Sequence, residues 1–434
     1  MSSATSSSNS NSSGSSSGSR IPWAIVVALS LGMLVYGVAE SYGPVAALIH
    51  SLPTNLAFLG YSLPFVAGGF GALFSGWLAD SIGRKMSFVV TAALIVIGVI
   101  LYLIYSSWAS ATTFWLLVAS FVLVGMAAIG LESPILAMLA EAVPAKWRGN
   151  LLVVVQNFGN LGVAITFIPV LIGLSGLAGN VAIAMLFIAP LAALIIALMV
   201  AGESLPWSAA AGRSSMDVKS AWRSVDGEAE PVKPGGSSLW FRLLVLIVLG
   251  IAQDVGFVYI TYGVSYSYFT EALAESVPIV GGLTMTIVGI IFGIFFVERI
   301  RRKALAVLSF GMQMVFWAIL WAYVAATHST AGMALMALMT IQFLPVELTW
   351  ASRAVLEPEL FATRVRGRLI SVVRAVVWIV AGIITGALTS MTLPFNIAAA
   401  FVFAMFVLSV AVAAAWWAWG FETAGRSLSG HDVL

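Results

Sequence analysis

The sequence predicts an all-α membrane protein with twelve transmembrane helices, arranged as two six-helix bundles. Three observations predict this fold class. Of the 434 residues, 61% are hydrophobic and 9% are charged, whereas a soluble domain carries roughly 25% charged residues. No Asp, Glu, Lys or Arg occurs in residues 86–131, 149–202 and 375–421, and each window is long enough for two crossings of about 20 residues. The charged motifs of the first half also recur in the second half.

Twelve apolar segments follow one another along the chain, and each suits one spanning helix. They lie near residues 22–48, 57–79, 86–106, 112–138, 149–173, 179–201, 240–264, 277–297, 304–326, 331–352, 367–390 and 394–420. Strands of a membrane barrel alternate apolar and polar residues, and these segments do not. Helices are therefore the structure that satisfies the backbone polar groups in lipid.

The Lys and Arg residues predict the orientation of the chain. All of the 20 except Arg353 and Arg374, which lie within predicted helices, fall in the tails or in connections on one side of the membrane. Positive residues concentrate in cytoplasmic loops. We therefore expect both termini in the cytoplasm and a multi-pass integral protein of the cell membrane.

Polar segments predict the domain boundaries. Residues 1–19 are rich in Ser, Asn and Gly, a composition typical of a disordered tail. Residues 203–238 contain Gly, Ser, Pro and mixed charges and divide the hydrophobic chain, so we expect a cytoplasmic linker there. The two bundles then span 20–202 and 239–421, and residues 422–434 form a cytoplasmic C-terminal tail.

Composition and motifs argue against several functions. The net charge of +2 is too small to indicate a nucleic-acid partner. The chain has no cysteine, and its three histidines lack ligand-like spacing, so we assign no metal and no other cofactor. We find no phosphate-cradling glycine loop, HExxH motif or nucleophile elbow, and we expect no enzyme activity.

An internal repeat relates the two halves. A shift of 218 residues brings the acid, Arg and Lys of GWLADSIGRK at 76–85 into register with those of IFFVERIRRK at 294–303. The same shift relates EAVPAKWRG at 141–149 to ELFATRVRG at 359–367, and Glu203 lies 219 residues before Glu422. Many transporters use such duplication to build two bundles around a site at the membrane midplane.

These motifs resemble those of the major facilitator superfamily. Residues 76–85 resemble its signature G-x-L-a-D-r-x-G-R-[KR]. Residues 141–149 resemble the E-x-x-P-x-x-x-R-G element of sugar porters and related metabolite symporters. The segments GESLPW at 202–207 and FETAGRSL at 421–428 are similar to the P-E-S-P-R-W-L and P-E-T-K-G-R-S-L motifs of the same branch.

The resemblance implies that the charged residues of these motifs form a cytoplasmic gate, in two related clusters that separate when that side opens. The expected gate residues are Asp80, Arg84, Glu141, Arg148, Glu203, Glu298, Arg302, Glu359, Arg366 and Glu422. The alternative is a set of solvated interfacial charges that only orient the chain.

Four carboxyl groups within the predicted helices are candidates for proton coupling. Ionisable groups in hydrocarbon cost roughly 2.5 to 3.5 kcal/mol on insertion scales, so each is a functional candidate. At about 1.5 Å per residue, Asp254 and Glu347 lie about 18 Å from the cytoplasmic helix ends, Glu132 roughly 9 to 13 Å, and Glu40 about 30 Å. The resemblance places all four on cavity-lining helices. A carboxyl in a low dielectric can load a proton on one side and release it on the other.

Structural roles remain open for these groups. Glu40 is alternatively a hydrated carboxylate at the outer mouth. Glu132 and Glu347 are alternatively paired with Arg353 or Arg374, whose guanidinium forks also suit an anionic substrate. The side-chain amides of Gln156, Asn157 and Asn160 are candidates for substrate binding, and the alternative is that they form hydrogen bonds between helices. The candidate substrate-binding residues are Gln156, Asn157, Asn160, Gln253, Tyr259, Tyr262, Arg353 and Arg374.

The sequence therefore favours a secondary active transporter that works by alternating access as a monomer. We expect proton-coupled symport of a small polar solute, either sugar-like or a small organic acid. Proton-driven export of amphipathic compounds is one alternative, and a transporter-like membrane sensor is another.

Overall fold

The computed structural model describes residues 20–52, 54–391 and 393–432. The predicted disordered tail at 1–19 lies outside these residues. The first half contains α1 (Trp23–Ile49), α2 (Thr54–Ser81), α3 (Arg84–Ser107), α4 (Phe114–Ala142), α5 (Ala145–Thr166), α6 (Ile168–Leu171) and α7 (Gly176–Val200). The second half contains α10 (Leu239–Val258), η1 (Tyr259–Val264), α11 (Ser265–Tyr268), α12 (Glu271–Phe295), η2 (Val297–Arg299), α13 (Arg302–Thr327), α14 (Met333–Glu359), η3 (Thr363–Val365), α15 (Arg366–Ser390), α16 (Phe395–Trp419) and η4 (Leu428–His431).

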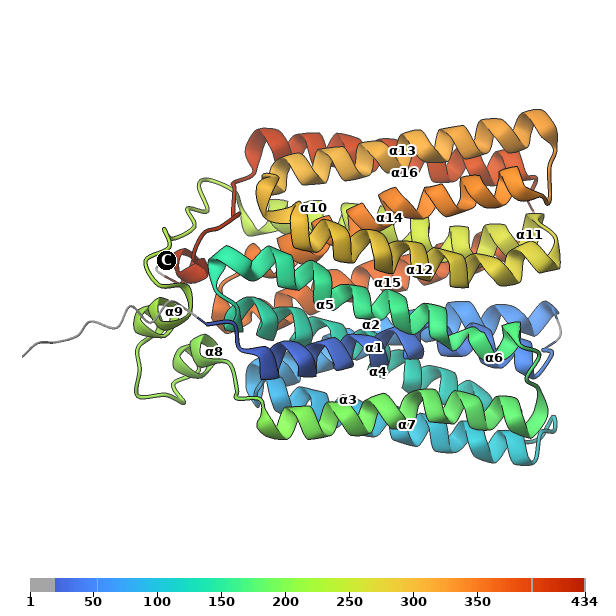
Figure 1. Cartoon of the computed structure of the whole chain (residues 1–434), viewed down its shortest axis with the longest axis horizontal. Helices are drawn as coiled ribbons and strands as arrows, with labels where there is room; N and C mark the ends of the chain where they lie inside the picture. Colours follow the sequence, from blue (N-terminus) through green and yellow to red (C-terminus); the bar gives the residue numbers. More distant parts are fainter. Residues whose placement is uncertain (1–19, 53, 392, 433–434) are drawn as a thin grey trace, which may run out of the picture.

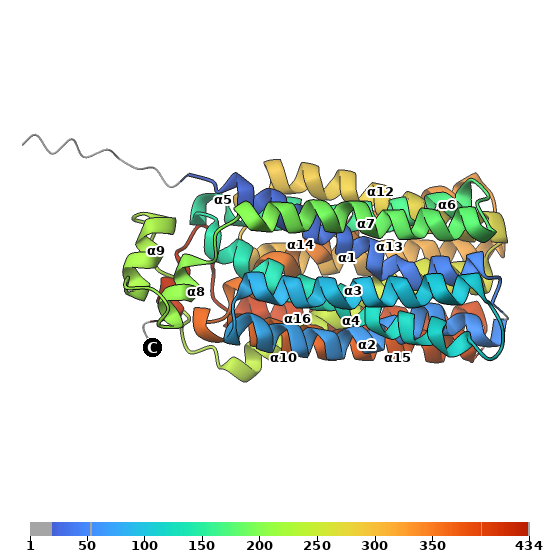
Figure 2. The ribbon, with the colours of Figure 1, turned by 90° about the horizontal axis from the view of Figure 1, so that it is seen from below.

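Twelve spans in the described part of the chain are long and apolar enough to cross a membrane. The number of crossings predicted from the sequence is confirmed. The long helices run side by side along the longest axis of the molecule (Figures 1 and 2). Elements α8 (Leu205–Ala210) and α9 (Val218–Asp226) lie with the C-terminal segment at one end, which we call the charged end.

The two halves meet along two pairs of helices. Helix α2 packs along α15, and α5 packs along α12. In Figure 1, α3 and α7 lie on the outside of the first half, and α13 and α16 lie on the outside of the second. The remaining long helices surround the centre of the molecule.

Two regions differ from the expected elements. The segment 203–238, expected to be a linker, contains the short helices α8 and α9, because Ser204 and Asp217 cap them by accepting hydrogen bonds from the backbone N–H groups of Trp207 and Ser220. The crossing expected as one helix at 240–264 changes to a π-helix at η1. Such π segments inside α-helices occur frequently at functional sites.

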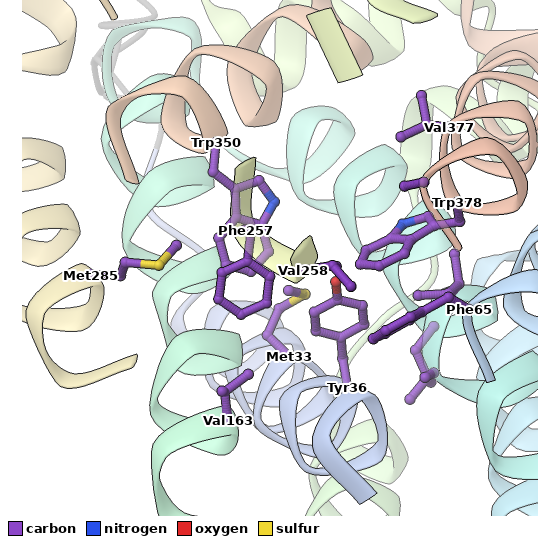
Figure 3. Packing of buried hydrophobic residues seen from close by; sticks show 14 of the residues in the cluster. Met33, Tyr36, Phe65, Val163, Phe257, Val258, Met285, Trp350, Val377 and Trp378 are labelled. Atoms are coloured by element: carbon purple, nitrogen blue, oxygen red, sulfur yellow. The ribbon is translucent and has the colours of Figure 1, made fainter. Parts of the chain in front are cut away.

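Aromatic side chains from both halves meet at the centre (Figure 3). Phe65 of α2 stacks on Trp378 of α15, with ring centroids 5.1 Å apart. Tyr36 of α1 lies 6.3 Å from the ring of Trp350 of α14. The core of the bundle is therefore continuous across the two halves.

Small residues allow the helices to approach closely. A Cβ atom on Gly71 of α2 would lie 2.0 Å from the main-chain oxygen of Met126 of α4. We expect Gly71→Ala to lower the melting temperature in detergent, because overpacking costs about 1–3 kcal/mol. Gly311→Ala is the control, since a Cβ there meets nothing within 4 Å. Equal melting temperatures for the two variants would contradict this account of the packing.

Candidate functional site

The first charged cluster joins α2, α3 and α4 at the charged end. Arg84, fully buried at the start of α3, donates to Glu141 of α4 at 2.8 and 3.3 Å and also bonds Asp80 of α2. Glu203, after α7, accepts from the backbone N–H of Lys85 at 3.1 Å. Burial raises the pKa of Glu203. These four charged side chains hold the ends of four elements together.

The second half repeats this geometry with the residues that the 218-residue shift predicts. Arg302 donates to Glu359 with two bonds of 3.1 Å and to Glu298 at 3.0 Å. Glu422, which corresponds to Glu203 at a shift of 219 residues, accepts from the backbone N–H of Lys303 at 3.5 Å and from that of Arg302 at 2.9 Å. The internal repeat is therefore present in the hydrogen bonds as well as in the sequence.

Several bonds at the charged end join one half to the other. Arg366 of α15 donates to Glu141 at 2.9 Å, so this buried carboxylate is shared with Arg84. Asp80 accepts from the backbone N–H groups of Gly367 and Arg368 in the first turn of α15. Glu298 accepts from the backbone N–H of Gly149 in α5 at 2.6 Å. An acid near a helix N-terminus is stabilised by the helix dipole.

One predicted gate residue has an unexpected partner. The resemblance grouped Arg148 with Glu141, but its charge is met by Asp226 of α9 at 2.5 Å. The sequence analysis did not identify Asp226, because it lies in a segment with no counterpart in the repeat.

The linker and the C-terminal segment form a clasp over the charged end. The ring of Trp222 in α9 lies 5.6 Å from the guanidinium carbon of Arg148 and 5.5 Å from that of Arg366. Asp432 accepts from the backbone N–H of Thr363 and from the indole N–H of Trp222, both at 2.9 Å. Burial lowers the pKa of His431 to about 4. Its ring nitrogen lies 2.8 Å from the main-chain oxygen of Glu359.

Within the membrane spans, five ionisable side chains form a chain of ion pairs. Asp254 of α10 pairs with Arg353 at 2.8 Å, and Arg353 pairs with Glu357 at 2.9 Å. Arg374 of α15 pairs with Glu357 and with Glu132, each at 2.6 Å. Gln253 also accepts from Arg353. Because Glu132 belongs to the first half, the chain crosses between the halves.

Sequence analysis missed Glu357 in this chain. It was not considered among the interior carboxyl groups, although it lies only two residues before Glu359. A usable signal was present, since Glu357 follows Arg353 by four residues and therefore lies on the same face of α14.

Glu347 has a different environment. It is buried, and its two oxygens accept from the side-chain amides of Asn157 and Asn160 in α5, each at 2.8 Å. No Lys or Arg contacts it among the described residues. The bridge again joins the two halves, here by amides rather than by ion pairs.

The remaining predicted site residues lie near the centre with few polar partners. The side-chain oxygen and nitrogen of Gln156 and the hydroxyl of Tyr259 are buried without a hydrogen-bond partner among the described residues. The Tyr262 hydroxyl lies 3.4 Å from Oγ of Ser41. Glu40, in the middle of α1, is 2% exposed.

A cavity of about 680 Å³ lies at the end opposite to the charged end. Its lining residues come from α1, α6, η1, α11, α12 and α15 and include the exposed Ser51 and Glu271. Tyr262, Tyr266 and Tyr268 contribute aromatic rings to the wall. Hydrogen bonds thus join the two halves at the charged end, and a cavity lies between them at the opposite end.

Comparison with known proteins identifies relatives that match most of this chain. A family model described as "Sugar (and other) transporter" matches residues 7–434. Glucose transporter GlcP of Staphylococcus epidermidis is 25% identical over 375 residues, which cover 80% of this chain and 82% of that protein. YfiG of Bacillus subtilis, named as a metabolite transport protein, is 26% identical over 65% of this chain. The chain spans 64% of the length of YfiG.

The solved structures that resemble the chain include the proton:xylose symporter XylE bound to 6-bromo-6-deoxy-D-glucose. The TM-score is 0.72 at 18% identity, and the match covers 95% of this chain and 98% of that chain. A partially occluded inward-open structure of XylE from E. coli matches with a TM-score of 0.67. At this identity the likeness shows the shared fold.

We expect Glu141→Gln to open the charged end, because it leaves Arg84 and Arg366 without their shared charge. Removing one partner of a buried ion pair costs about 3–5 kcal/mol. The chain has no cysteine, so Ser371→Cys, buried between α15 and α2, is a clean reporter. Its reaction with a maleimide should become faster, while that of Leu388→Cys in the cavity wall should become slower.

The control is Glu228→Gln at an exposed position, which should change neither rate. Faster reaction at both reporters would indicate unfolding, and unchanged rates would contradict the gate assignment.

We expect the clasp to release on acidification. The ordinary pKa of histidine is about 6.5, and the docked His431 has a lowered pKa of about 4. The released segment therefore binds the proton more tightly. Docking is fully stable above about pH 6.5 and weakens as the pH falls toward 4, by about 3 kcal/mol in total. Fluorescence anisotropy of a label on a C-terminal cysteine measures docking, and His431→Asn should remove the response between pH 6.5 and 5.

Proposed function

Because the chain belongs to the sugar (and other) transporter family of the major facilitator superfamily, we propose that it carries a small polar solute across the membrane by proton-coupled symport. The family consists of transport proteins rather than enzymes. The twelve apolar spans make the chain a multi-pass integral protein of the cell membrane. The charged end, where the Lys and Arg of the connections gather, faces the cytoplasm in this proposal.

The observation that carries the proposal is the asymmetry between the two ends of the molecule. At the charged end, Asp80, Glu141 and Glu298 each bond the opposite half. At the other end, a cavity of about 680 Å³ separates elements of the two halves. This arrangement corresponds to one of the two states that alternating access requires, with the charged end closed.

Opening the charged end requires these bonds to break together. The bundles 20–202 and 239–421 are the proposed moving bodies, and residues 203–238 connect them. The protein needs no second copy for this motion, so we propose that it functions as a monomer. Closure of the opposite end supplies new contacts that offset the lost bonds, and the solute biases the equilibrium through its different affinity for the two states.

The partners of the interior carboxyls suggest how a proton is coupled. Asp254 and Glu132 are neutralised by arginines, which favour the charged form of a carboxyl. Glu347 and Glu40 have no such partner among the described residues. We assign the transported proton to Glu347, because its bonds to Asn157 and Asn160 cross between the halves and link its protonation to their movement.

Export of amphipathic compounds remains a second candidate. The specific observation that favours it is the aromatic lining of the cavity by Tyr262, Tyr266 and Tyr268. Such a surface suits a ligand with an apolar body and a few polar groups.

The primary test reconstitutes the protein in liposomes and measures uptake of labelled sugars, organic acids and amines, with and without a proton gradient. We expect accumulation of at least one solute that a protonophore abolishes. A protein that accumulates none of the panel under any gradient is not the symporter proposed here.

Glu347→Gln tests the assignment of the proton. The variant keeps the shape of the side chain and removes its titratable group, so gradient-driven accumulation should be lost while exchange of labelled for unlabelled solute continues. Glu228→Gln serves as the matched control and should behave as the parent protein does. Accumulation that survives in Glu347→Gln would show that another group carries the proton.

A further inference from the structure

We propose that the solute is an organic cation, whose ammonium group binds Glu40 and whose body fills the cavity at the end opposite to the charged end. The inference rests on the proposed transport function and specifies the substrate class. It depends on the charge balance of the interior, the unpaired acceptors at Glu40, and the composition of the cavity wall.

The interior of the bundle carries an excess of acid. Within the membrane spans there are two arginines, Arg353 and Arg374, away from the charged end. The carboxyl groups inside the spans, away from both ends, number five, and they are Glu40, Glu132, Asp254, Glu347 and Glu357. Two arginines cannot neutralise five carboxyl groups, so an anionic solute placed here would add to the negative charge of those that are ionised.

Both arginines are already matched by carboxylates. Arg353 contacts Asp254 and Glu357, and Arg374 contacts Glu357 and Glu132, at 2.6 to 2.9 Å. Nη2 of Arg374 has no acceptor among the described residues. An anion that approached this nitrogen would still meet the two carboxylates that flank it. The arginines therefore do not form a site for an organic acid.

Glu40 presents acceptors that the described protein does not satisfy. Its Oε2 is buried without a hydrogen bond of good geometry, and the hydroxyl of Tyr36, one turn away on the same helix, is the protein donor that interacts with this carboxyl group. Pro44 lies four residues on in α1 and has no N–H to donate to the Glu40 main-chain oxygen. Oε2 of Glu40 thus lacks a close donor, and the main-chain oxygen lacks its i+4 N–H, in the middle of a buried helix where an unpaired polar group is costly.

A similar proline elsewhere shows that the fold can satisfy such a group. Pro134 of α4 leaves the main-chain oxygen of Gly130 without its helical donor. There the hydroxyl of Ser75 donates to that oxygen. In the described residues no side chain does the same for Glu40, so its acceptors remain available to a ligand that donates hydrogen bonds or carries positive charge.

Glu40 continues the face of α1 that lines the cavity. Pro44, Ala47 and Leu48 line the wall, and Glu40 precedes them by four, seven and eight residues. Residues at this spacing share one face of a helix. Tyr262, which also lines the cavity, is bonded to Ser41 beside Glu40. Glu40 therefore lies on the same face of α1, one turn deeper than the lining residues, and is itself buried beneath them.

The wall and the mouth suit a cation with an apolar body. The tyrosine rings of the wall attract an ammonium group through their negative faces. Glu271 and Glu275 are the charged side chains of the lining, and no Lys or Arg is among them. Clefts lined by one sign of charge raise the local concentration of the opposite ion. The dipole of α12 explains Glu271 structurally, but it does not apply to Glu40, which is far from a helix end.

The experiment compares three phenols that differ in one group: 4-(2-trimethylammonioethyl)phenol, 4-(2-hydroxyethyl)phenol and 4-hydroxyphenylacetate. Binding to the full-length protein in detergent is measured by isothermal titration. We expect the ammonium compound to bind about tenfold more tightly than the alcohol, since a desolvated cation–π contact and a carboxylate together supply at least the 1.4 kcal/mol that this ratio requires. The carboxylate compound should bind least tightly.

A variant locates the site. Glu40→Gln should reduce the preference for the ammonium compound over the alcohol to about one, because it removes the charge and keeps the shape. Glu228→Gln is the matched control and should leave the preference unchanged. If Glu40→Gln does not fold, the order of the three ligands on the parent protein still decides the question. Equal affinities, or tighter binding of the carboxylate compound, would overturn the inference.

Uptake separates this inference from the transport function on which it rests. If a sugar is taken up in a gradient-driven manner and the ammonium compound shows no binding preference, the cation proposal is wrong and the proposed transport function stands. Selective binding of the ammonium compound without uptake of any solute supports the cation site and counts against transport.

Discussion

The closed end of the molecule depends on one buried carboxylate, that of Glu141. Arg84 of its own half and Arg366 of the other half donate to the same oxygen, at 2.8 and 2.9 Å, and all three side chains are fully buried. Two guanidinium groups in so little space repel each other unless an acid lies between them. Any motion that separates the halves must therefore rehydrate at least one of these charges, and that requirement makes the contact responsive to the state of the transporter.

Two acidic side chains that accept hydrogen bonds from helix N-termini extend this contact across the interface between the halves. Asp80 bonds the first turn of α15, and Glu298 bonds α5, so each half places an acid against a helix of the other. The clasp of Trp222, His431 and Asp432 adds a further layer, which contacts Arg148 and Arg366 from outside. Arg148 and Arg366 are buried where the clasp covers them, so the linker and the C-terminal segment belong to the same closure as the buried ion pairs.

Much of this arrangement could be predicted from the sequence, because the repeat has a fixed spacing. The bond of Arg84 to Glu141 predicts that of Arg302 to Glu359, and both are present. The family was likewise recognisable from short motifs, and the match to residues 7–434 confirms it. Partners outside the repeat were not predictable. Asp226 and Asp432 lie in segments without a counterpart, and a sequence does not specify which distant segment folds against Arg148 or Thr363.

The interior was predictable in depth but not in pairing. The rise per residue of a helix places Asp254, Glu347 and Arg374 along the membrane normal, but not the direction in which each side chain points. Arg374 therefore faces Glu357 and Glu132 rather than a solute, while Glu347 faces two asparagines. The rotation of each helix is set by packing, for example where the ring of Phe65 stacks on that of Trp378.

The two ends of the molecule close by different physics. The charged end is held by ion pairs and helix caps, whose desolvation has already occurred in this state. The opposite end has no Lys or Arg in its connections, so it has no ion pairs of this kind to form. Its closure must come from apolar and aromatic surface, to which the π-helix at η1 contributes Tyr259 and Tyr262. A solute that neutralises Glu40 would lower the electrostatic cost of that packing, so that binding itself favours closure of the end through which the solute entered.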